Sequence, residues 1–289
     1  MTTKSAPPLP GAFIWRRLHS LTGLWLVLYL ILHLFTNSQA ALPVGDYGKG
    51  FIKSVNDINQ LPYLHVLEII LLLIPFAAHT LLGIQYLFTA KYNSGPSNGT
   101  TPSLPEYPRN HAYTWQRITS WILLVLITFH VIHMRFLEKP IAAEHGVDKY
   151  YITKIYQDPG VHTLADHLSI ALYTPEQMKQ KDVAWINDVS IGSLQKNQLV
   201  AVANNFAAAE LLVVRETFKS PLMILLYTLL VLSACFHGFN GLWTFMISWG
   251  VTLSPPTQNK MRIVATSLMG LIAFLGLAAV WGTYWIASV

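Results

Sequence analysis

Cysteine and charge are both scarce in this sequence. Cys235 is the single cysteine among 289 residues, which excludes an internal disulfide framework and a metal cluster ligated by cysteines. Only 11% of the residues are Asp, Glu, Lys or Arg, against about a quarter in an average soluble domain. Because 53% of the residues are hydrophobic, this composition indicates a membrane protein. Cys235 lies in an apolar run, where we expect a buried and inert thiol.

The sequence contains several long apolar runs with few charged residues. A spanning helix needs about 20 mostly apolar residues. Five stretches meet this requirement: 13–36, 64–90, 112–137, 221–249 and 262–287. Loops rich in turn residues separate several of them, at 92–110 and 252–260. We predict an all-α integral membrane bundle of five transmembrane helices.

The predicted spans divide the chain into three parts. Spans one to three occupy 1–137 and spans four and five occupy 221–289, together forming one membrane domain. The segment between them, 138–220, is polar enough to be exposed to water. Thr174 and Pro175 are a plausible helix start, and 197–218 has helical periodicity. We expect a partly helical outer cap here, whose role the sequence does not reveal.

Charge predicts which side each end of the chain occupies. With the N-terminus inside, the inner segments hold eight basic residues and one acidic residue, Glu106. The basic residues are Lys4, Arg16, Arg17, Lys91, Arg109, Arg117, Lys260 and Arg262. The short outer loop 37–63 holds two lysines, so the distribution follows the positive-inside rule. We expect a cytoplasmic N-terminus and an outer C-terminus. The first span resembles a signal peptide, but it is longer than a typical one and four spans follow, so we expect it to be retained.

Spans one to four each hold a histidine that lipid would not tolerate alone. An isolated imidazole in hydrocarbon is costly unless it is hydrogen-bonded or bound to another group. These residues are His33, His79, His130 and His237. With the predicted orientation, His33 and His130 lie in the outer half, and His79 and His237 lie past the middle of spans that run inward. Helices wound in chain order place span one opposite three and two opposite four. This arrangement pairs His33 with His130, and His79 with His237.

Each pair could bind a flat macrocycle with one imidazole on either side of its iron. Gly83 and Gly241 follow His79 and His237 by four residues, so each leaves room on the same helix face. We predict two six-coordinate haems stacked across the membrane, which would carry electrons because they have no open site. The alternatives are histidines that hydrogen-bond between helices, and a proton-coupled transporter with histidine relays and no haem.

Five segments resemble one known family. They are RRLHS at 16–20, LPYLHVLEI at 61–69, FTAKYNSG at 88–95, WQRITS at 115–120 and FHGFNGLWTFMISWGVTLSP at 236–255. Together they are similar to the five-helix, two-haem cytochrome b anchor of succinate:quinone oxidoreductases, which include succinate dehydrogenases and fumarate reductases. The resemblance covers all five spans, and the segment through His237 is its most specific part.

The resemblance implies a particular set of haem contacts. The axial ligands of the family match His79 and His237 for the inner haem, and His33 and His130 for the outer haem. In the family, polar residues at the start of helix one hold the inner haem propionates, and those positions match His19 and Ser20. Arg17 and Trp115 are further candidates by depth alone.

The resemblance also implies partners on the inner face. These are a flavoprotein that oxidises succinate with FAD and an iron–sulfur subunit, in a bacterial inner membrane. Electrons would pass through the inner and then the outer haem to a quinone. The chain has no flavin-binding fold, dinucleotide loop or cluster cysteines, so we expect no succinate oxidation by this chain alone. Alternatives are a two-haem anchor for another dehydrogenase, such as a hydrogenase or formate dehydrogenase, and a structural anchor that carries no electrons.

A quinone being reduced needs protons, and two titratable residues lie at the outer end of span two. His65 and Glu68 are three residues apart and share one helix face. They are candidates for relaying protons to an outer quinone site, and interfacial hydrogen bonding is the alternative. Reduction on the outer side would favour a low-potential quinone such as menaquinone, because the membrane potential acts on the charges that cross.

The sequence departs from the family in two places. The segment after span three is far longer than the usual connection. Fumarate-reducing members that return protons across the membrane have a glutamate two residues before the fourth ligand, where this chain has Cys235. This weakens the assignment of a fumarate reductase that uses that proton route. Among the other histidines, we expect His133 to be interfacial and His111 to be wetted.

Overall fold

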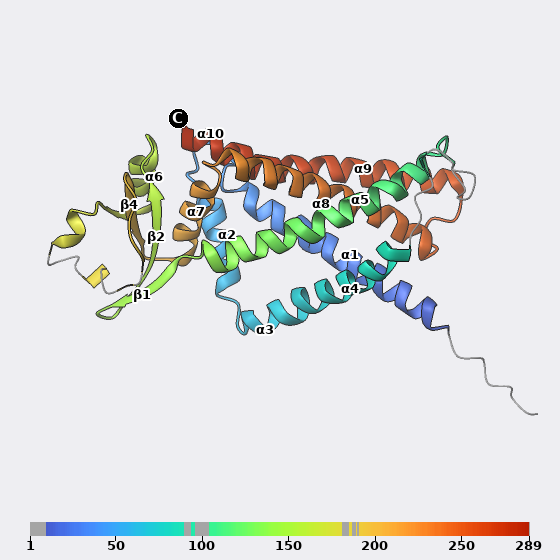
Figure 1. Ribbon diagram of the computed structural model, residues 1–289, viewed down its shortest axis with the longest axis horizontal. Coiled ribbons are helices and arrows are strands. Elements are labelled where there is room, and N and C mark those ends of the chain that lie inside the picture. Colours follow the sequence, from blue (N-terminus) through green and yellow to red (C-terminus); the bar gives the residue numbers. More distant parts are fainter. Residues whose placement is uncertain are drawn as a thin grey trace, which may run out of the picture. The chain divides into compact units, whose positions relative to one another are not determined.

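Five long helical stretches dominate the computed structural model, which describes residues 10–89, 94–95, 104–180, 185–186, 189 and 191–288. They are Gly11–Ser38, Leu64–Phe88, Pro108–Leu137, Pro221–Ser248 and Pro255–Ile286, each long and apolar enough to cross a membrane (Figure 1). The five predicted spans and the predicted helical membrane fold are confirmed. Most of the predicted loop 92–110 falls outside the described residues.

The spans are built from these elements. The first is α1 (Gly11–Ser38), and the second joins α3 (Leu64–Glu68), the π-helical η1 (Ile69–Leu73) and α4 (Ile74–Thr89). The third joins α5 (Pro108–Ile132) to η2 (His133–Leu137), and the fourth is α8 (Pro221–Ser248). The fifth joins α9 (Pro255–Leu277), η5 (Ala278–Gly282) and α10 (Thr283–Ser288). Three elements start at a proline, whose missing N–H costs nothing in the first turn of a helix.

A proline inside the second span shapes its packing. Pro75 has no N–H, so the carbonyl oxygen of Leu71 loses its usual partner four residues later. The indole Nε1 of Trp25 on α1 donates a hydrogen bond to that carbonyl oxygen. The turn just before the proline is also widened, because the Ile74 N–H donates to Ile69 rather than to Ile70. Trp25 thus compensates for the break in the second span and joins it to the first.

The chain packs as two compact units. The first unit comprises the described residues of Met1–Ile31, His65–Leu124 and Ser233–Leu271. The second comprises those of Leu32–Leu64, Val125–Leu232 and Ile272–Val289. Each unit contains parts of several spans, and the second also contains the whole cap. The predicted division of the chain into 1–137, 138–220 and 221–289 follows the ends of the spans rather than these two units, and it stays a prediction.

The cap contains a four-stranded antiparallel sheet that the sequence did not predict. Its order is β1 (Ile141–His145), β2 (Asp148–Tyr156), β4 (Gln198–Ala203) and β3 (Ala171–Tyr173). The helical periodicity of 197–218 corresponds to a helix only in its second part, because β4 precedes α7 (Phe206–Thr217). Asn205 caps α7, its side chain accepting a hydrogen bond from the Ala208 N–H at 2.9 Å. Thr174 does precede a helical turn, but only the short η3 (Gln177–Lys179).

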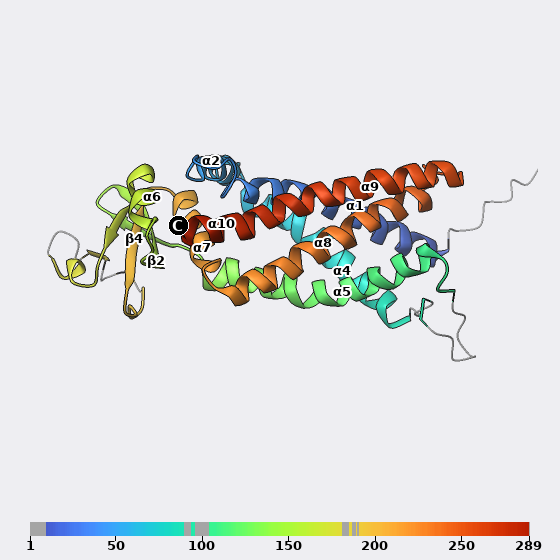
Figure 2. The same ribbon diagram turned by 90° about the horizontal axis from the view of Figure 1, so that it is seen from above.

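Strand β4 is buried on both faces of the sheet. Leu199 and Ala201 pack on one side with α7 and with α6 (Val161–Leu168). Val200 and Val202 pack on the other side with Met178 and Ile186, among other residues. A strand covered on both sides reads as a continuous apolar run rather than an alternating one. Figure 2 shows α7 and α6 together with the strands of this sheet.

A short helix in the loop after the first span covers α7. This helix, α2 (Lys49–Asn59), packs against α7. Gly48, just before α2, has a positive φ of 70°, and a Cβ there would come within 2.7 Å of Leu211 on α7. Glycine is required at this position both for the backbone conformation and for the close approach.

A buried ion pair joins three parts of the second unit. The Arg215 guanidinium on α7 donates to Asp158 Oδ1 at 2.7 Å and to the Ile286 carbonyl oxygen on α10 at 3.3 Å. Both side chains are almost fully buried, and Lys219 Nζ lies 2.9 Å from Asp158 Oδ2. Burial alone raises the pKa of Asp158, but the hydrogen bonds and charges of Arg215 and Lys219 outweigh it and hold the pKa below its usual value.

Replacing Asp158 should loosen the cap. Asp158→Asn leaves Arg215 buried without its counter-charge, and we expect a loss of about 3 kcal/mol in the free energy of opening the cap. Because the folded-state pKa is lowered, the ionised carboxylate stabilises the cap above about pH 4, and this contribution is lost as the pH falls through the folded-state value. Hydrogen exchange of residues 141–217 in the full chain measures the effect. Asp166→Asn, at an exposed position, is the control, and equal protection in both variants would contradict the expectation.

Candidate functional site

Two of the predicted histidine ligands face each other in the first unit. The ring centroids of His79 on α4 and His237 on α8 lie 6.2 Å apart, with the ring planes at 88°. Each ring has an acceptor at Nδ1: the His19 carbonyl oxygen lies 3.0 Å from His79 Nδ1, and the Gln116 carbonyl oxygen lies 3.3 Å from His237 Nδ1. A proton on Nδ1 leaves Nε2 of both rings as the nitrogen that can bind a metal.

His19 completes this first site. Its ring stacks on that of His79 at 4.1 Å between centroids, with 11° between the planes. His19 Nδ1 is buried and has no hydrogen-bond partner in the structure. Two glycines make room for these rings, because a Cβ at Gly23 would lie 2.8 Å from His79 Cε1 and one at Gly83 would lie 3.3 Å from His19 Cε1. A buried polar atom without a partner among the described residues is unusual in a folded protein, so His19 Nδ1 is available to a further group.

Of the other candidates for propionate contacts, Arg17 and Ser20 contact the end of α8, whereas Trp115 is exposed. Ser20 Oγ accepts a hydrogen bond from Trp249 Nε1 at 2.9 Å. The Arg17 guanidinium donates to the Ser248 carbonyl oxygen and lies 4.9 Å from the Trp249 ring. Arg17 and Ser20 therefore meet at the end of α8, and along α1 they lie two residues before His19 and one residue after it. The Trp115 side chain is 53% exposed and is not stacked on these residues.

A hydrogen-bonded pair that the sequence analysis missed supports His237. Gln116 on α5 donates from Nε2 to the His237 carbonyl oxygen at 3.0 Å. Asn240 donates from Nδ2 to Gln116 Oε1 at 2.7 Å. Both residues lie in the quoted segments that carry the family resemblance, WQRITS and FHGFNG, and that is the one signal that could have identified them.

The second predicted pair lies in the second unit. The ring centroids of His33 on α1 and His130 on α5 are 5.9 Å apart, with 74° between the planes. The Tyr227 hydroxyl on α8 lies 3.3 Å from His130 Nδ1 and 3.2 Å from His133 Nδ1. His130 therefore also has a partner at Nδ1 that leaves Nε2 for a metal.

His133, which the sequence analysis expected to be interfacial, is buried among neighbouring side chains. Its exposed fraction is 7%, and its ring stacks on Phe129 with centroids 5.3 Å apart. The helical spacing of three places it on the same side as His130, where Tyr227 contacts both. Sequence reasoning missed Tyr227, because an aromatic residue in an apolar span is indistinguishable from core. His111 is exposed, as expected, and its Nε2 lies 2.7 Å from the Pro105 carbonyl oxygen.

Both pairs fit a six-coordinate haem iron. A metal–imidazole bond of about 2 Å on each side separates the centroids of two opposed rings by roughly 6 Å. The centroid separations of 6.2 Å and 5.9 Å match that value. The Nδ1 partners and the unsatisfied Nδ1 of His19 agree with it as well.

His65 and Glu68 form the pair expected from their spacing. His65 Nδ1 lies 3.2 Å from Glu68 Oε2 on α3. The His65 side chain is 84% exposed and that of Glu68 is 35% exposed. Both groups are thus accessible and close enough to exchange a proton with each other.

Comparison with known proteins identifies a relative along nearly the whole chain. No family model matches the sequence. The chain is 27% identical over 269 residues to the succinate dehydrogenase cytochrome b558 subunit of Bacillus subtilis, covering 93% of this chain and 95% of that protein. This similarity agrees with the resemblance predicted from the sequence.

The five apolar helices and the similarity to this membrane subunit support a multi-pass membrane protein. The match covers 93% of the chain. All four histidines of the two pairs lie more than 30 residues from either end of the sequence, so the match includes them.

Removing the Gln116 amide should weaken the first unit. Gln116→Leu leaves the Asn240 amide and the His237 carbonyl oxygen without these partners, at a cost of about 1–3 kcal/mol. The expected result is a lower midpoint of thermal unfolding for the purified chain in detergent. Thr244→Val is the matched control, since Thr244 is exposed and its hydroxyl bonds only to Gly241 of its own helix. A shift no larger than that of the control would contradict a supporting role for Gln116.

Proposed function

We propose that this chain is the membrane anchor of a succinate dehydrogenase and holds two b haems. The observation that carries the proposal is the separation within each histidine pair, 6.2 Å and 5.9 Å, which suits one iron between two imidazoles. The similarity to a succinate dehydrogenase cytochrome b558 subunit supports the same function. A haem held by two histidines supplies one-electron transfer when bound.

His79 and His237 would hold the inner haem, and His33 and His130 the outer haem. In the first unit, the partnerless His19 Nδ1 supports a role in binding a haem propionate. Arg17 and Ser20, which meet at Trp249 and Ser248, offer a cation and a hydroxyl for the same purpose. In the second unit, the Tyr227 hydroxyl would orient the His130 ring through Nδ1.

Soluble subunits would supply the catalytic chemistry. The sequence offers no flavin-binding fold and no cluster cysteines, so succinate oxidation belongs to a flavoprotein with FAD, and electrons would arrive from an iron–sulfur subunit. The excess of basic residues at one end of the spans supports a cytoplasmic N-terminus, and the partners would then bind at the cytoplasmic face. The C-terminus would then lie outside the inner membrane of a bacterium.

The quinone site would lie on the outer side, beside the outer end of the second span. A second haem serves a purpose only if the acceptor is farther out than the first. The His65–Glu68 pair supports the placement, because both groups are titratable and accessible. Protons taken up outside while electrons cross outward would couple the reaction to the membrane potential, at about 2.3 kcal/mol per charge per 100 mV. That coupling would suit a low-potential quinone such as menaquinone.

Single substitutions of the histidines should separate the two haems. We expect two low-spin b haems per chain, with His79→Ala and His237→Ala each abolishing one redox transition and His33→Ala and His130→Ala each abolishing the other. A quantitative pyridine haemochrome assay and an optical redox titration of the purified complex measure both results. His162→Ala, at an exposed position in the cap, is the control. One haem per chain, or a haem shared by His33 and His79, would overturn the assignment, and no haem at all would favour the transporter alternative.

The carboxylate of Glu68 should be needed for quinone reduction. Glu68→Gln keeps the size of the side chain but cannot carry a proton, so we expect quinone reduction by the complex to slow by about tenfold or more. Both haem spectra and succinate oxidation with an artificial dye should stay unchanged. Asp57→Asn removes an exposed carboxylate of α2 and serves as the control. Unchanged quinone reductase activity in Glu68→Gln would remove this residue from the site.

A further inference from the structure

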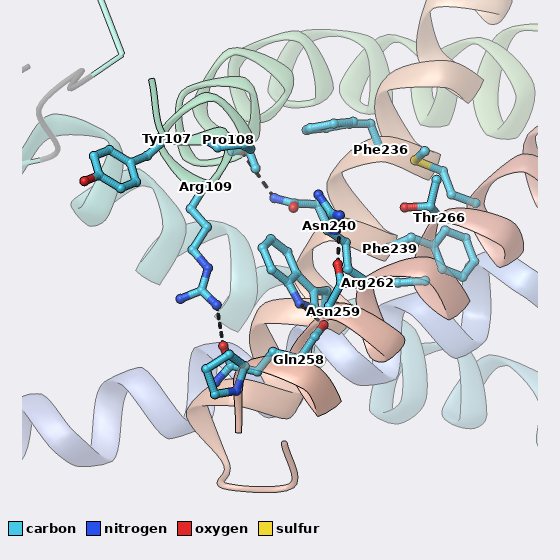
Figure 3. Close-up of a pocket in the computed structure, with 15 residues that line it drawn as sticks. Tyr107, Pro108, Arg109, Phe236, Phe239, Asn240, Gln258, Asn259, Arg262 and Thr266 are labelled. Carbon is cyan, nitrogen blue, oxygen red and sulfur yellow. Dashed lines mark hydrogen bonds between the residues drawn. The ribbon is translucent and has the colours of Figure 1, made fainter. Parts of the chain in front are cut away.

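A pocket of about 430 Å³ in the first unit lies apart from the histidine pair. It is lined by the start of α5, by one face of α8 and by one face of α9. On α8 the lining residues recur at helical spacing, from Phe236 and Phe239 to Asn240 and Trp243. The pocket thus runs along the helices rather than across one loop (Figure 3).

The two ends of this pocket differ in chemistry. At one end Arg109 and Trp243 both contact Gln258, and Arg262 follows Gln258 by one turn of α9. Phe236 lies seven residues before Trp243 on α8 and Met269 lies eleven residues after Gln258 on α9, toward the other end. In Figure 3 the Arg109 side chain reaches toward Gln258, and Phe236 and Phe239 lie away from it. The lining therefore suits a molecule with a polar head and an apolar body.

The polar end has a net positive charge. The described residues that line the pocket include two arginines and no aspartate, glutamate or histidine. Neutral side chains position both guanidinium groups: Arg109 donates to Gln258 Oε1, and Arg262 donates to Asn259 Oδ1 at 2.8 Å. Arg109 also lies 5.9 Å from the Trp243 ring centroid. Two arginines with no acidic side chain among the described lining residues suit a phosphate group, whose oxygens accept from guanidinium forks.

We propose that this pocket binds an anionic phospholipid. Arg109 and Arg262 would hold the headgroup phosphate, and an acyl chain would lie along Phe236, Phe239 and Met269. From Pro255 to Met269 the pocket follows α9 over 14 residue-to-residue steps, or about 21 Å at 1.5 Å per step. This length is comparable with one leaflet, including its headgroups, of a bilayer about 40–45 Å thick overall.

A lipid fits this pocket better than a quinone does. Reduction of a quinone requires groups that deliver protons at the site, and the pocket lining offers none of the carboxylates or imidazoles that do so near neutral pH. A phospholipid needs only charge at the head and apolar surface along the chain. The proposal does not depend on the haems, because none of the four predicted ligands lines the pocket.

The pocket also contacts the network that supports His237. Asn240 lines the pocket and donates to Gln116, which in turn donates to the His237 carbonyl oxygen. A lipid in the pocket would contact α5, α8 and α9 at once and hold Asn240 in place. We therefore expect bound lipid to raise the thermal stability of the first unit as well as to occupy the pocket.

Lipid binding to the purified full chain tests the proposal. After delipidation in a neutral detergent, phosphatidylglycerol or phosphatidylcholine is added and bound lipid is counted by native mass spectrometry. We expect the chain to bind phosphatidylglycerol more tightly than phosphatidylcholine. Arg109→Gln and Arg262→Gln should each weaken the binding of phosphatidylglycerol about fivefold. This factor corresponds to the contribution of one basic residue to anionic lipid binding. The double variant should lose about 25-fold. Lys260→Gln removes a neighbouring exposed cation that does not line the pocket, and it should bind like the unmodified chain.

Other outcomes would overturn the proposal. Undiminished phosphatidylglycerol binding in the double variant would remove the lipid from this pocket. Equal binding of phosphatidylcholine would remove the requirement for an anionic head. If sodium phosphate stabilised the chain as much as phosphatidylglycerol does, the pocket would be a site for a free anion. If an inhibitor displaced a quinone from the pocket, the pocket would be a second quinone site. The haem content of these variants is measured separately, so failure here does not affect the proposed function.

Discussion

Imidazole groups inside apolar helices cannot stay unsatisfied, and the structure is organised around this requirement. An unpaired polar group away from water costs more than most single contacts contribute. Backbone carbonyl oxygens of His19 and Gln116 serve the Nδ1 atoms of His79 and His237, and the Tyr227 hydroxyl serves that of His130. Because Nδ1 has a partner in each of these three rings, Nε2 remains as the nitrogen that can bind a metal. Under the same requirement, His19 Nδ1, which is buried without a partner among the described residues, is available to a further group.

The backbone follows the same rule inside the spans. Pro75 breaks the hydrogen-bond ladder of the second span, and Trp25 satisfies the carbonyl oxygen of Leu71 that the break leaves over. Trp25 lies two residues after Gly23, whose missing side chain leaves space for His79. The first and second spans are therefore joined by one indole hydrogen bond and one close ring contact within the same stretch of α1. A substitution at Trp25 would leave this carbonyl oxygen of the second span without its donor.

The sequence was sufficient for the spans and the histidine pairs because both depend on strong local signals. Length and hydropathy define a spanning helix, and the direction of each helix limits which histidines can meet. It was insufficient for the cap, because β4 is covered on both faces and the apolar run at 198–203 has no alternation to mark it as a strand. It also missed Tyr227 and the burial of His133, since their roles arise from contacts between helices that are distant in the chain. Gln116 and Asn240 were missed for the same reason, although they stood in recognised segments.

The cap is part of the structure around the second histidine pair. Arg215 of α7 bonds at once to Asp158, in the loop that follows β2, and to the carbonyl oxygen of Ile286 in the last span. At the end of the same helix, Phe218 packs edge-on against Tyr227 with centroids 5.2 Å apart, and Thr217 approaches the Met134 sulfur at 4.0 Å. Tyr227 in turn contacts both His130 and His133. Because buried side chains are closely packed and transmit small displacements, the position of the Tyr227 hydroxyl depends on how α7 is held in the cap. The long segment between the third and fourth spans is thus connected through two aromatic rings to a predicted haem ligand, which gives the cap a physical means of influencing that site.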